Sequence, residues 1–299
     1  MSIIPQIDHK INIEQYQERK ERRHRLAGLG NNAILGRDLP AVKLQFHPGG
    51  VIGKRPMVSS VLPPAESRRG EIKGFSVKSR RRLREKLIAI DWQQIIPPEG
   101  QSETGFFLTL TYPRQYPDDW QEWKKHLRAF IRRVERRCDV QAIVWKLEMQ
   151  KRFAPHFHII LILRTPVRKR WLQKWVSLAW YEVVASEDVR HLRAGTNVRP
   201  LYGKAGKLLR YLSKYFSKPW QAQQGTGRVW GVIGDLPIGD VLTVTLTWRR
   251  WVNFSRRIRR WGRRSPYVAS IDGNTSGFLV YGDRAQLTQL LRGLWQPDI

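Results

Sequence analysis

The stretch Leu147–Leu163, LEMQKRFAPHFHIILIL, constrains the fold of this chain more than any other. From Phe157 onward it is apolar enough to be a strand in the middle of a core. The preceding AIVWKLEMQ (142–150) predicts a second strand, and the short connection KRFAP predicts that the two pair as a hairpin. An antiparallel sheet is therefore expected at the centre of the fold.

The segment before this hairpin predicts a strand and then a helix. GFFLTLTYP (105–113) alternates between two faces until a proline ends it, as a half-buried strand does. DDWQEWKKHLRAFIRRVERR (118–137) begins with Asp119 and Glu122 in capping-box spacing and repeats apolar residues at helical intervals.

Three further elements follow the hairpin. TPVRKRWLQKWVSLAWYEVV (165–184) predicts a helix with Pro166 in its first turn. TNVRPLY (196–202) predicts a short strand, and GKAGKLLRYLSKYFSKPW (203–220) predicts a helix that Pro219 ends. On one side of the first of these helices we expect Val167, Trp171, Trp175 and Leu178. The order of elements predicts an α+β palm of the split βαβ type, an antiparallel sheet with helices on one face.

Basic extensions flank this palm. The first 95 residues show little periodicity until SVKSRRRLREKLIAIDW (76–92), which predicts a short basic helix, and we interpret them as an arm. Downstream, GRVWGVIG and DVLTVTLTWRR are strand-like, and Trp248–Arg264 holds eight arginines and no acid. That run is a phosphate clamp or a charged tail. The predicted domains are an N-terminal arm (1–95), the palm (96–236) and a C-terminal extension (237–299). The candidate phosphate contacts are Arg256, Arg257, Arg259 and Arg260.

The charge of the chain indicates its partner. It has 54 Lys and Arg against 25 Asp and Glu, a formal net charge of +29, and a field of that sign attracts nucleic acid. A membrane surface is the alternative, but no stretch approaches the roughly 20 apolar residues of a spanning helix, and MSIIPQIDHK has no signal-peptide pattern. We expect a cytoplasmic protein. The single cysteine, Cys138, agrees with a reducing compartment and excludes a cysteine-based zinc cluster. YGKAGKLLRY lacks the P-loop pattern, which argues against an ATP-driven motor.

Two histidines open the apolar strand. Alternate residues of a strand share a face, so the imidazoles of His156 and His158 point the same way. The hairpin brings Glu148 across from them, and two His and one Glu make three ligands with positions left for water or substrate. The alternative is ordinary: rim histidines bonded to water or backbone, and a salt bridge from Glu148 to an arginine.

The segment YLSKYFSK carries a second constellation. Tyr211, Lys214, Tyr215 and Lys218 project from one stripe of a helix, and Leu209, Leu212 and Phe216 form an apolar stripe that can hold it on the sheet. These tyrosines either pack in the core or act on a substrate. Opposite a metal patch, a phenolate is a nucleophile toward phosphorus once cations lower its pKa, and the lysines can supply that charge or hold the phosphate. Two tyrosines permit two successive transfers.

Together these motifs resemble the HUH endonucleases. HFH is similar to their His-hydrophobe-His metal motif, FLTLTYP to their first motif, and YLSKYFSK to the two-tyrosine form of their third, as in rolling-circle initiators of small single-stranded-DNA phages and related plasmids. The element GRVWGV also resembles the phage replication-associated proteins. The resemblance extends from Phe106 to Asp235.

The resemblance implies a chemistry and a set of partners. A divalent Mg or Mn ion is held by His156 and His158, with the third ligand mapped to Glu148. Tyr211 or Tyr215 attacks single-stranded origin DNA, leaving a 5′-phosphotyrosine and a 3′-OH that a host DNA polymerase extends, with a host helicase opening the duplex. Imidazole also suits Zn or Ni, so the choice of metal rests on the family.

Other functions stay open. A transposase or mobilisation relaxase uses the same chemistry, although a relaxase usually places its histidines after its tyrosine. A non-catalytic single-stranded nucleic-acid binder would rely on charge and on the 13 tryptophans, which either stack on bases or lie in the core and under arginine stems. Thr109 and Thr111 are candidate contacts to the DNA backbone, or ordinary strand threonines.

Overall fold

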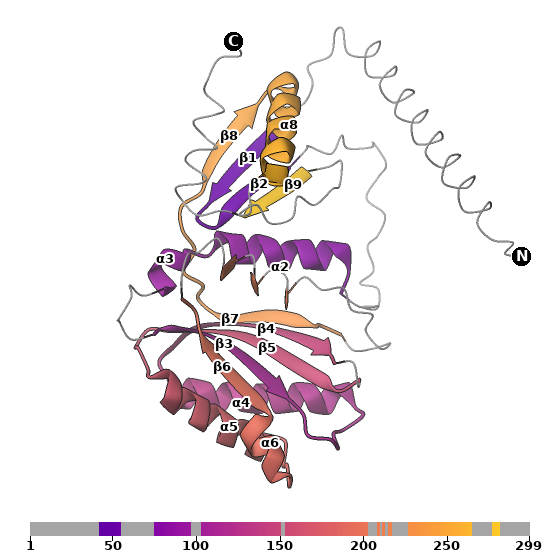
Figure 1. Cartoon of the computed structure of the whole chain (residues 1–299), viewed down its shortest axis with the longest axis vertical. Helices are drawn as coiled ribbons and strands as arrows, with labels where there is room; N and C mark the ends of the chain where they lie inside the picture. The colour runs from indigo at the N-terminus through magenta and orange to yellow at the C-terminus, as the bar shows by residue number, and fades with distance from the viewer. Residues whose placement is uncertain are drawn as a thin grey trace, which may run out of the picture.

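Two antiparallel sheets lie on opposite sides of a basic helix, α2 (Val77–Ala89), in the computed structural model of the chain (Figure 1). The structure describes residues 42–54, 75–96, 103–150, 153–202, 208–209, 211–212, 215–216, 227–264 and 277–281. One sheet has five strands and the other has four.

The five-stranded sheet is the predicted palm. Its strands are β3 (Gly105–Thr111), β4 (Val140–Met149), β5 (Pro155–Leu163), β6 (Thr196–Pro200) and β7 (Trp230–Gly234), in the order β6-β3-β5-β4-β7 with every pair antiparallel. The hairpin prediction is confirmed, because β4 pairs with β5 and Glu148 stands opposite His156. β5 is the central strand, which explains its continuous apolar sequence. The α+β fold with an antiparallel palm is as predicted.

One face of the palm is covered by α4 (Trp120–Arg137) and α5 (Lys169–Val183), with the short α6 (Val189–Ala194) beside them. Asp119 caps α4 as expected: its carboxylate accepts a hydrogen bond from the Gln121 backbone N–H at 2.8 Å. Glu122, the other half of the predicted capping box, forms an ion pair with Lys125.

Two expectations for α5 are wrong. Pro166 precedes the helix, whose N-cap is Arg168, and the Leu178 side chain is 49% exposed. The buried side is turned by about one residue, because Trp171 and Trp175 are too large for the layer between helix and sheet and stay half-buried. The residues that face the core are Leu172, Val176, Ala179 and Trp180.

The other face of the palm carries α2 and the tyrosine segment. The described residues of that segment (208, 209, 211, 212, 215 and 216) are helical. The predicted apolar stripe is confirmed: Leu209, Leu212 and Phe216 are fully buried in one core cluster with residues of α2 and of the palm. α2 begins at its N-cap Ser76, and it is followed by α3 (Trp92–Ile95). The sequence predicted α2 as a helix but not its place beneath the tyrosine segment.

Segments from both predicted extensions form the four-stranded sheet. β1 (Val42–His47), β2 (Gly50–Lys54), β8 (Leu242–Leu246) and β9 (Gly277–Tyr281) are arranged β8-β1-β2-β9. The predicted basic helix is α8 (Trp248–Arg264), which packs Trp251, Phe254 and Ile258 against this sheet. The domain boundaries stay predictions, but the two extensions are joined by strand pairing that local sequence patterns do not reveal.

The second sheet supports the tyrosine helix through α2. The backbone N–H of Gly49, in the turn between β1 and β2, donates to the Ile88 carbonyl of α2 at 3.1 Å. The same turn approaches the tyrosine helix so closely that a Cβ on Gly49 would lie 2.6 Å from Leu209 Cδ2. No helix in the described part of the chain is both long and apolar enough to span a bilayer.

Candidate active site

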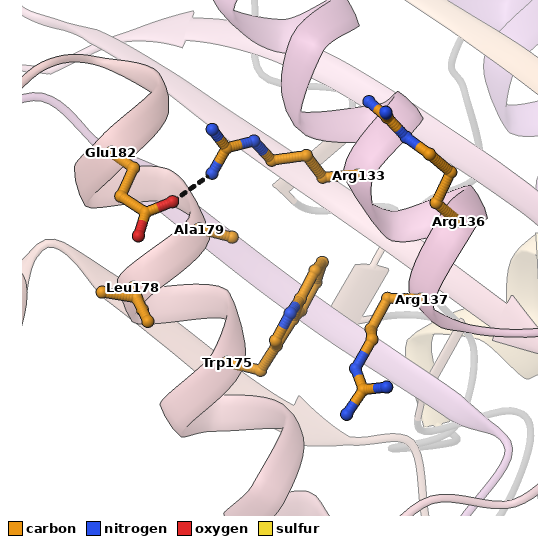
Figure 2. A pocket seen from close by; sticks show the side chains of 7 residues that line it. All are labelled: Arg133, Arg136, Arg137, Trp175, Leu178, Ala179 and Glu182. Atoms are coloured by element: carbon orange, nitrogen blue, oxygen red, sulfur yellow. Dashed lines mark hydrogen bonds and ion pairs between the residues drawn. The ribbon is translucent and has the colours of Figure 1, made fainter.

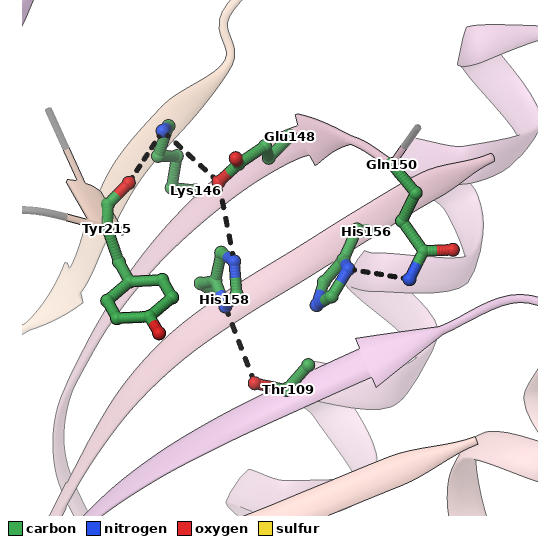
Figure 3. A network of polar contacts seen from close by, with 7 residues as sticks. All are labelled: Thr109, Lys146, Glu148, Gln150, His156, His158 and Tyr215. Atoms are coloured by element: carbon green, nitrogen blue, oxygen red, sulfur yellow. Dashed lines mark hydrogen bonds and ion pairs between the residues drawn. The ribbon is translucent and has the colours of Figure 1, made fainter. Parts of the chain in front are cut away.

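The predicted metal ligands lie on the palm face that the tyrosine helix covers (Figure 3). Three neighbouring strands, β3, β5 and β4, each present alternate polar residues to that face. The pairing aligns them in two rows across the sheet: Thr109, His158 and Lys146 in one, and Thr111, His156 and Glu148 in the other.

The glutamate and the histidines meet as the hairpin predicted. Glu148 Oε2 lies 3.4 Å from His158 Nε2, and the two imidazole rings are 4.4 Å apart between centroids. His158 is buried rather than on the rim. The basic partner of Glu148 is Lys146, with Nζ 3.6 Å from Oε2, where the alternative interpretation expected an arginine.

Contacts at Nδ1 orient both rings. Thr109 Oγ1 lies 3.4 Å from His158 Nδ1, and Gln150 Nε2 donates to His156 Nδ1 at 3.0 Å. An amide nitrogen only donates, so this contact puts the proton of a neutral His156 ring on Nε2. A half-turn of the Gln150 amide would let Oε1 accept from Nδ1 and leave the Nε2 lone pair for an ion.

The donor set suits a divalent ion, and two donors are placed for one. Ligands about 2.1 Å from one ion lie roughly 3.0 to 3.4 Å from each other, which matches the separation of Glu148 Oε2 and His158 Nε2. Within the described residues, however, no three His, Cys, Asp or Glu side chains are already gathered as a complete metal site. His156 is the member that must turn, through its contact with Gln150.

The tyrosines lie directly above this patch. The Tyr215 ring is 5.6 Å from the His158 ring, and the Tyr211 and Tyr215 rings are 4.6 Å apart. Phe107 of β3 stacks on His158 and touches both tyrosines, so it packs the two constellations together. Lys214 and Lys218, the predicted cations of this segment, lie outside the described residues.

The environment of Tyr211 was not predicted. Burial, followed by its hydrogen bond with Tyr215, raises the pKa of the Tyr211 hydroxyl, while the charge of Arg199 acts in the opposite direction. Arg199 Nη1 lies 3.5 Å from that hydroxyl. Arg199 is on β6, next to β3, where it pairs with Phe107. Its signal in the sequence was only a basic residue in the strand TNVRPLY.

Lys146 is the other residue that sequence reasoning missed. It is fully buried, its Nζ donates to the Tyr215 carbonyl at 2.9 Å, and it lies 5.2 Å from the centre of the Phe75 ring. The available signal was a lysine within an apolar strand, two residues before Glu148 and therefore on the same face.

The remaining predicted contacts are more scattered. Thr109 supports His158, and the Thr111 hydroxyl donates to the Gly195 carbonyl at 2.7 Å, so their role toward DNA stays a prediction. Arg256, Arg257 and Arg260 are exposed on α8, which lies beyond α2 from the palm; the side chain of Arg259 is outside the described set.

A cavity of about 270 Å³ lies on the opposite side of the palm, between α4 and α5 (Figure 2). Trp175, at its wall, stacks on Trp171 with 6.4 Å between ring centroids, and Arg137 covers Trp171. Arg133 forms an ion pair with Glu182 across the cavity. These tryptophans lie under arginine stems, one of the two positions expected for them.

The palm, its two strand histidines and the paired tyrosines above them define the chain as a rolling-circle replication initiator of the phage and plasmid type, as the motifs indicated. Residues 105–219 match the family of the replication-associated protein ORF2. The match covers the sheet strands β3 to β6 and the tyrosine segment.

Similar proteins carry the same kind of description. A putative replication protein of Xylella fastidiosa strain 9a5c is 28% identical over 248 residues, which cover 75% of this chain and 79% of that protein. A second from strain Temecula1 is 27% identical over 250 residues, 75% of this chain and 85% of that protein. A replication-associated protein of Pseudomonas phage Pf3 is 27% identical over 171 residues, 53% of this chain and 60% of that protein. No solved structure matches the chain.

Proposed function

We propose that this replication protein nicks single-stranded origin DNA with a tyrosine nucleophile and later rejoins the strands. The observation that carries the proposal is the contact between the two constellations: the Tyr215 ring adjoins His158, which in turn lies against Glu148. Tyrosines that merely filled a core would not need a buried imidazole and carboxylate beneath them.

The proposed reaction is a phosphoryl transfer. The tyrosine oxygen bonds to phosphorus while the bond from phosphorus to O3′ breaks. The phenol proton passes to solvent and the departing 3′-oxygen takes one up, which gives a 5′-phosphotyrosine and a free 3′-OH. In the closing step a 3′-OH attacks the phosphotyrosine, rejoins the DNA and releases the phenol.

Each part of the site has a task in this proposal. His156, His158 and Glu148 would hold a Mg or Mn ion, which supplies polarisation of the scissile phosphate when bound. Thr109 and Gln150 orient the two rings. Arg199 favours the phenolate of Tyr211. Lys214 and Lys218 are proposed to stabilise the phenolate or hold the phosphate, and Arg256, Arg257, Arg259 and Arg260 to bind DNA phosphates outside the site.

The proposal places the protein in the cytoplasm with its DNA. The free 3′-OH is the primer for a host polymerase, and a host helicase would supply further single strand, because this chain shows no P-loop. A transposase or relaxase would use the same chemistry, and the DNA around the gene would separate these roles.

The test uses single-stranded oligonucleotides that tile the DNA on either side of the coding sequence, labelled at the 5′ or the 3′ end. After incubation with Mn²⁺, a denaturing gel should show a free 5′ fragment and a protein adduct that carries the 3′ fragment. EDTA should abolish both products. Binding that survives EDTA, with no cleavage of any oligonucleotide under any metal, would support the non-catalytic binder instead.

A further inference from the structure

The two tyrosines have different neighbours. Both rings lie almost equally far from Phe107, at 5.9 Å for Tyr211 and 6.0 Å for Tyr215. Tyr215 faces His158, whereas the hydroxyl of Tyr211 lies 3.5 Å from Arg199 Nη1. Their apolar packing is therefore alike, and their polar surroundings distinguish them.

The buried cation Lys146 connects one of these tyrosines to the metal patch (Figure 3). Removing a charge from water is costly unless hydrogen bonds or an opposite charge compensate it. The Tyr215 carbonyl accepts a hydrogen bond from Nζ at 2.9 Å, and Glu148 Oε2 lies 3.6 Å away. Lys146 thus contacts the backbone of a proposed nucleophile and the side chain of a proposed ligand at once.

The contact to the carbonyl fixes the helix and not merely a side chain. A hydrogen bond to the Tyr215 backbone restrains how the helix slides along the palm, and so sets the position of the ring above His158. A nucleophile must be held close to its attack position, and a displacement of about 1 Å can cost on the order of 100-fold in rate.

We propose that Lys146 is a positioning residue that holds Tyr215 over the histidine patch, so that Tyr215 attacks in the first cleavage and Tyr211 in the second. This assignment rests on the proposed tyrosine chemistry and gives it an order. In the first step the Tyr215 oxygen bonds to the phosphorus of the origin strand and O3′ leaves as a hydroxyl. In the second, Tyr211 attacks a later phosphate, and the 3′-OH freed by that cut displaces Tyr215.

The sequence makes the assignment measurable. Trypsin cleaves after Lys214, so Tyr211 and Tyr215 fall on different peptides, YLSK and YFSKPWQAQQGTGR. The full chain is mixed with the tiled single-stranded oligonucleotides and Mn²⁺, and the reaction is stopped within the first turnover. Nuclease and trypsin digestion then allow mass spectrometry to compare the adduct on the two peptides.

We expect the wild-type adduct to favour Tyr215 by about tenfold or more, and Lys146→Met to reduce that ratio toward one while slowing cleavage by about 10- to 100-fold. Lys146→Arg, which keeps a cation, should restore part of the preference. Lys174→Met is the matched control, because Lys174 is exposed on α5 at the other face of the palm. Circular dichroism and DNA binding in EDTA check that each variant is folded.

Each outcome separates the two proposals. An adduct that is mainly on Tyr211, or equal on both peptides in the wild type, would overturn the order while leaving the tyrosine chemistry intact. A Lys146→Met protein that cleaves slowly but keeps the Tyr215 preference would remove Lys146 from the positioning role. No adduct on either peptide with any oligonucleotide would overturn the proposed function and the order with it.

Discussion

The two sheets of this protein carry their charges in opposite ways. On the palm, polar side chains are turned toward one another beneath a helix, and His158 and Lys146 are buried. On the four-stranded sheet, α8 turns its aromatic residues inward, and Arg250, Arg256, Arg257 and Arg260 are exposed.

The difference indicates a division of labour. A reaction at one phosphorus atom requires groups fixed at particular distances, which burial and mutual hydrogen bonds provide on the palm. Attraction of a DNA backbone requires only exposed positive charge, which α8 provides on its outer side. The two regions should therefore respond differently to substitution: the palm in cleavage, and α8 in affinity and its dependence on salt.

The largest expected effect is the loss of cleavage in His158→Ala. This change removes a proposed ligand and the neighbour of Tyr215, and cleavage should fall by about 100-fold or more. DNA affinity should change by less than about threefold, because it depends largely on Lys and Arg. His126→Ala is the control, since His126 lies on α4 and contacts Tyr112. Unchanged cleavage of single-stranded DNA by the His158 variant would remove that residue from the site.

The next effect tests the other side of the comparison. Replacing Arg256, Arg257, Arg259 and Arg260 with Ala should weaken DNA binding and lower the slope of log affinity against log salt by up to about 3, at roughly 0.7 to 0.9 per lost phosphate contact. Cleavage at saturating DNA should stay close to wild type. Arg128 and Arg132, exposed on α4, provide a control pair. A salt slope that does not move would show that α8 faces away from the DNA.

Much of the palm could be predicted because its signals are local. The alternation of β3, the apolar run of β5 and the cap of α4 each depend on neighbours in sequence, and the hairpin then placed Glu148 against the histidines. The four-stranded sheet could not be predicted in this way. β1 pairs with β8 from the opposite end of the chain, so Val42 stands beside Leu246, and neither strand contains a sign of its partner.

The site shows the same limit. The histidines, Glu148 and the tyrosines follow from motif spacing, but Lys146 and Arg199 act on the tyrosines from β4 and β6, across contacts that only the fold creates. The buried face of α5 was predicted wrongly because periodicity ranks Trp as apolar without regard to its size. Trp171 and Trp175 stayed half-buried beside arginines, and smaller residues took the core.

A smaller effect tests whether the two regions are mechanically joined. Gly49→Ala should destabilise the fold by about 1–3 kcal/mol through overpacking, because the new Cβ would lie 2.6 Å from Leu209 Cδ2 and 3.0 Å from the Ile88 carbonyl. Cleavage should fall more than DNA affinity, since Leu209 belongs to the tyrosine helix. Urea denaturation measures the stability, and Gly227→Ala is not a suitable control because its φ is positive. Ser177→Ala, on α5 at the far face, serves better.

The smallest effect concerns the titration of Tyr211. Burial and the hydrogen bond with Tyr215 raise the pKa of this hydroxyl, and the charge of Arg199 opposes them. Arg199→Ala should therefore raise the pKa of Tyr211 further, because a positive neighbour favours the phenolate. The raised pKa means that the native state holds its proton more tightly than the unfolded chain, so the stabilisation from the neutral form is present below the ordinary tyrosine pKa and is lost as the pH rises through the raised value. Ultraviolet difference titration of the phenolate, corrected with Tyr211→Phe, measures the shift, and Arg193→Ala on α6 is the exposed control. A titration that moves down or stays in place would show that Arg199 does not act on this tyrosine, and that the polar difference between the two tyrosines comes from the Lys146 side alone.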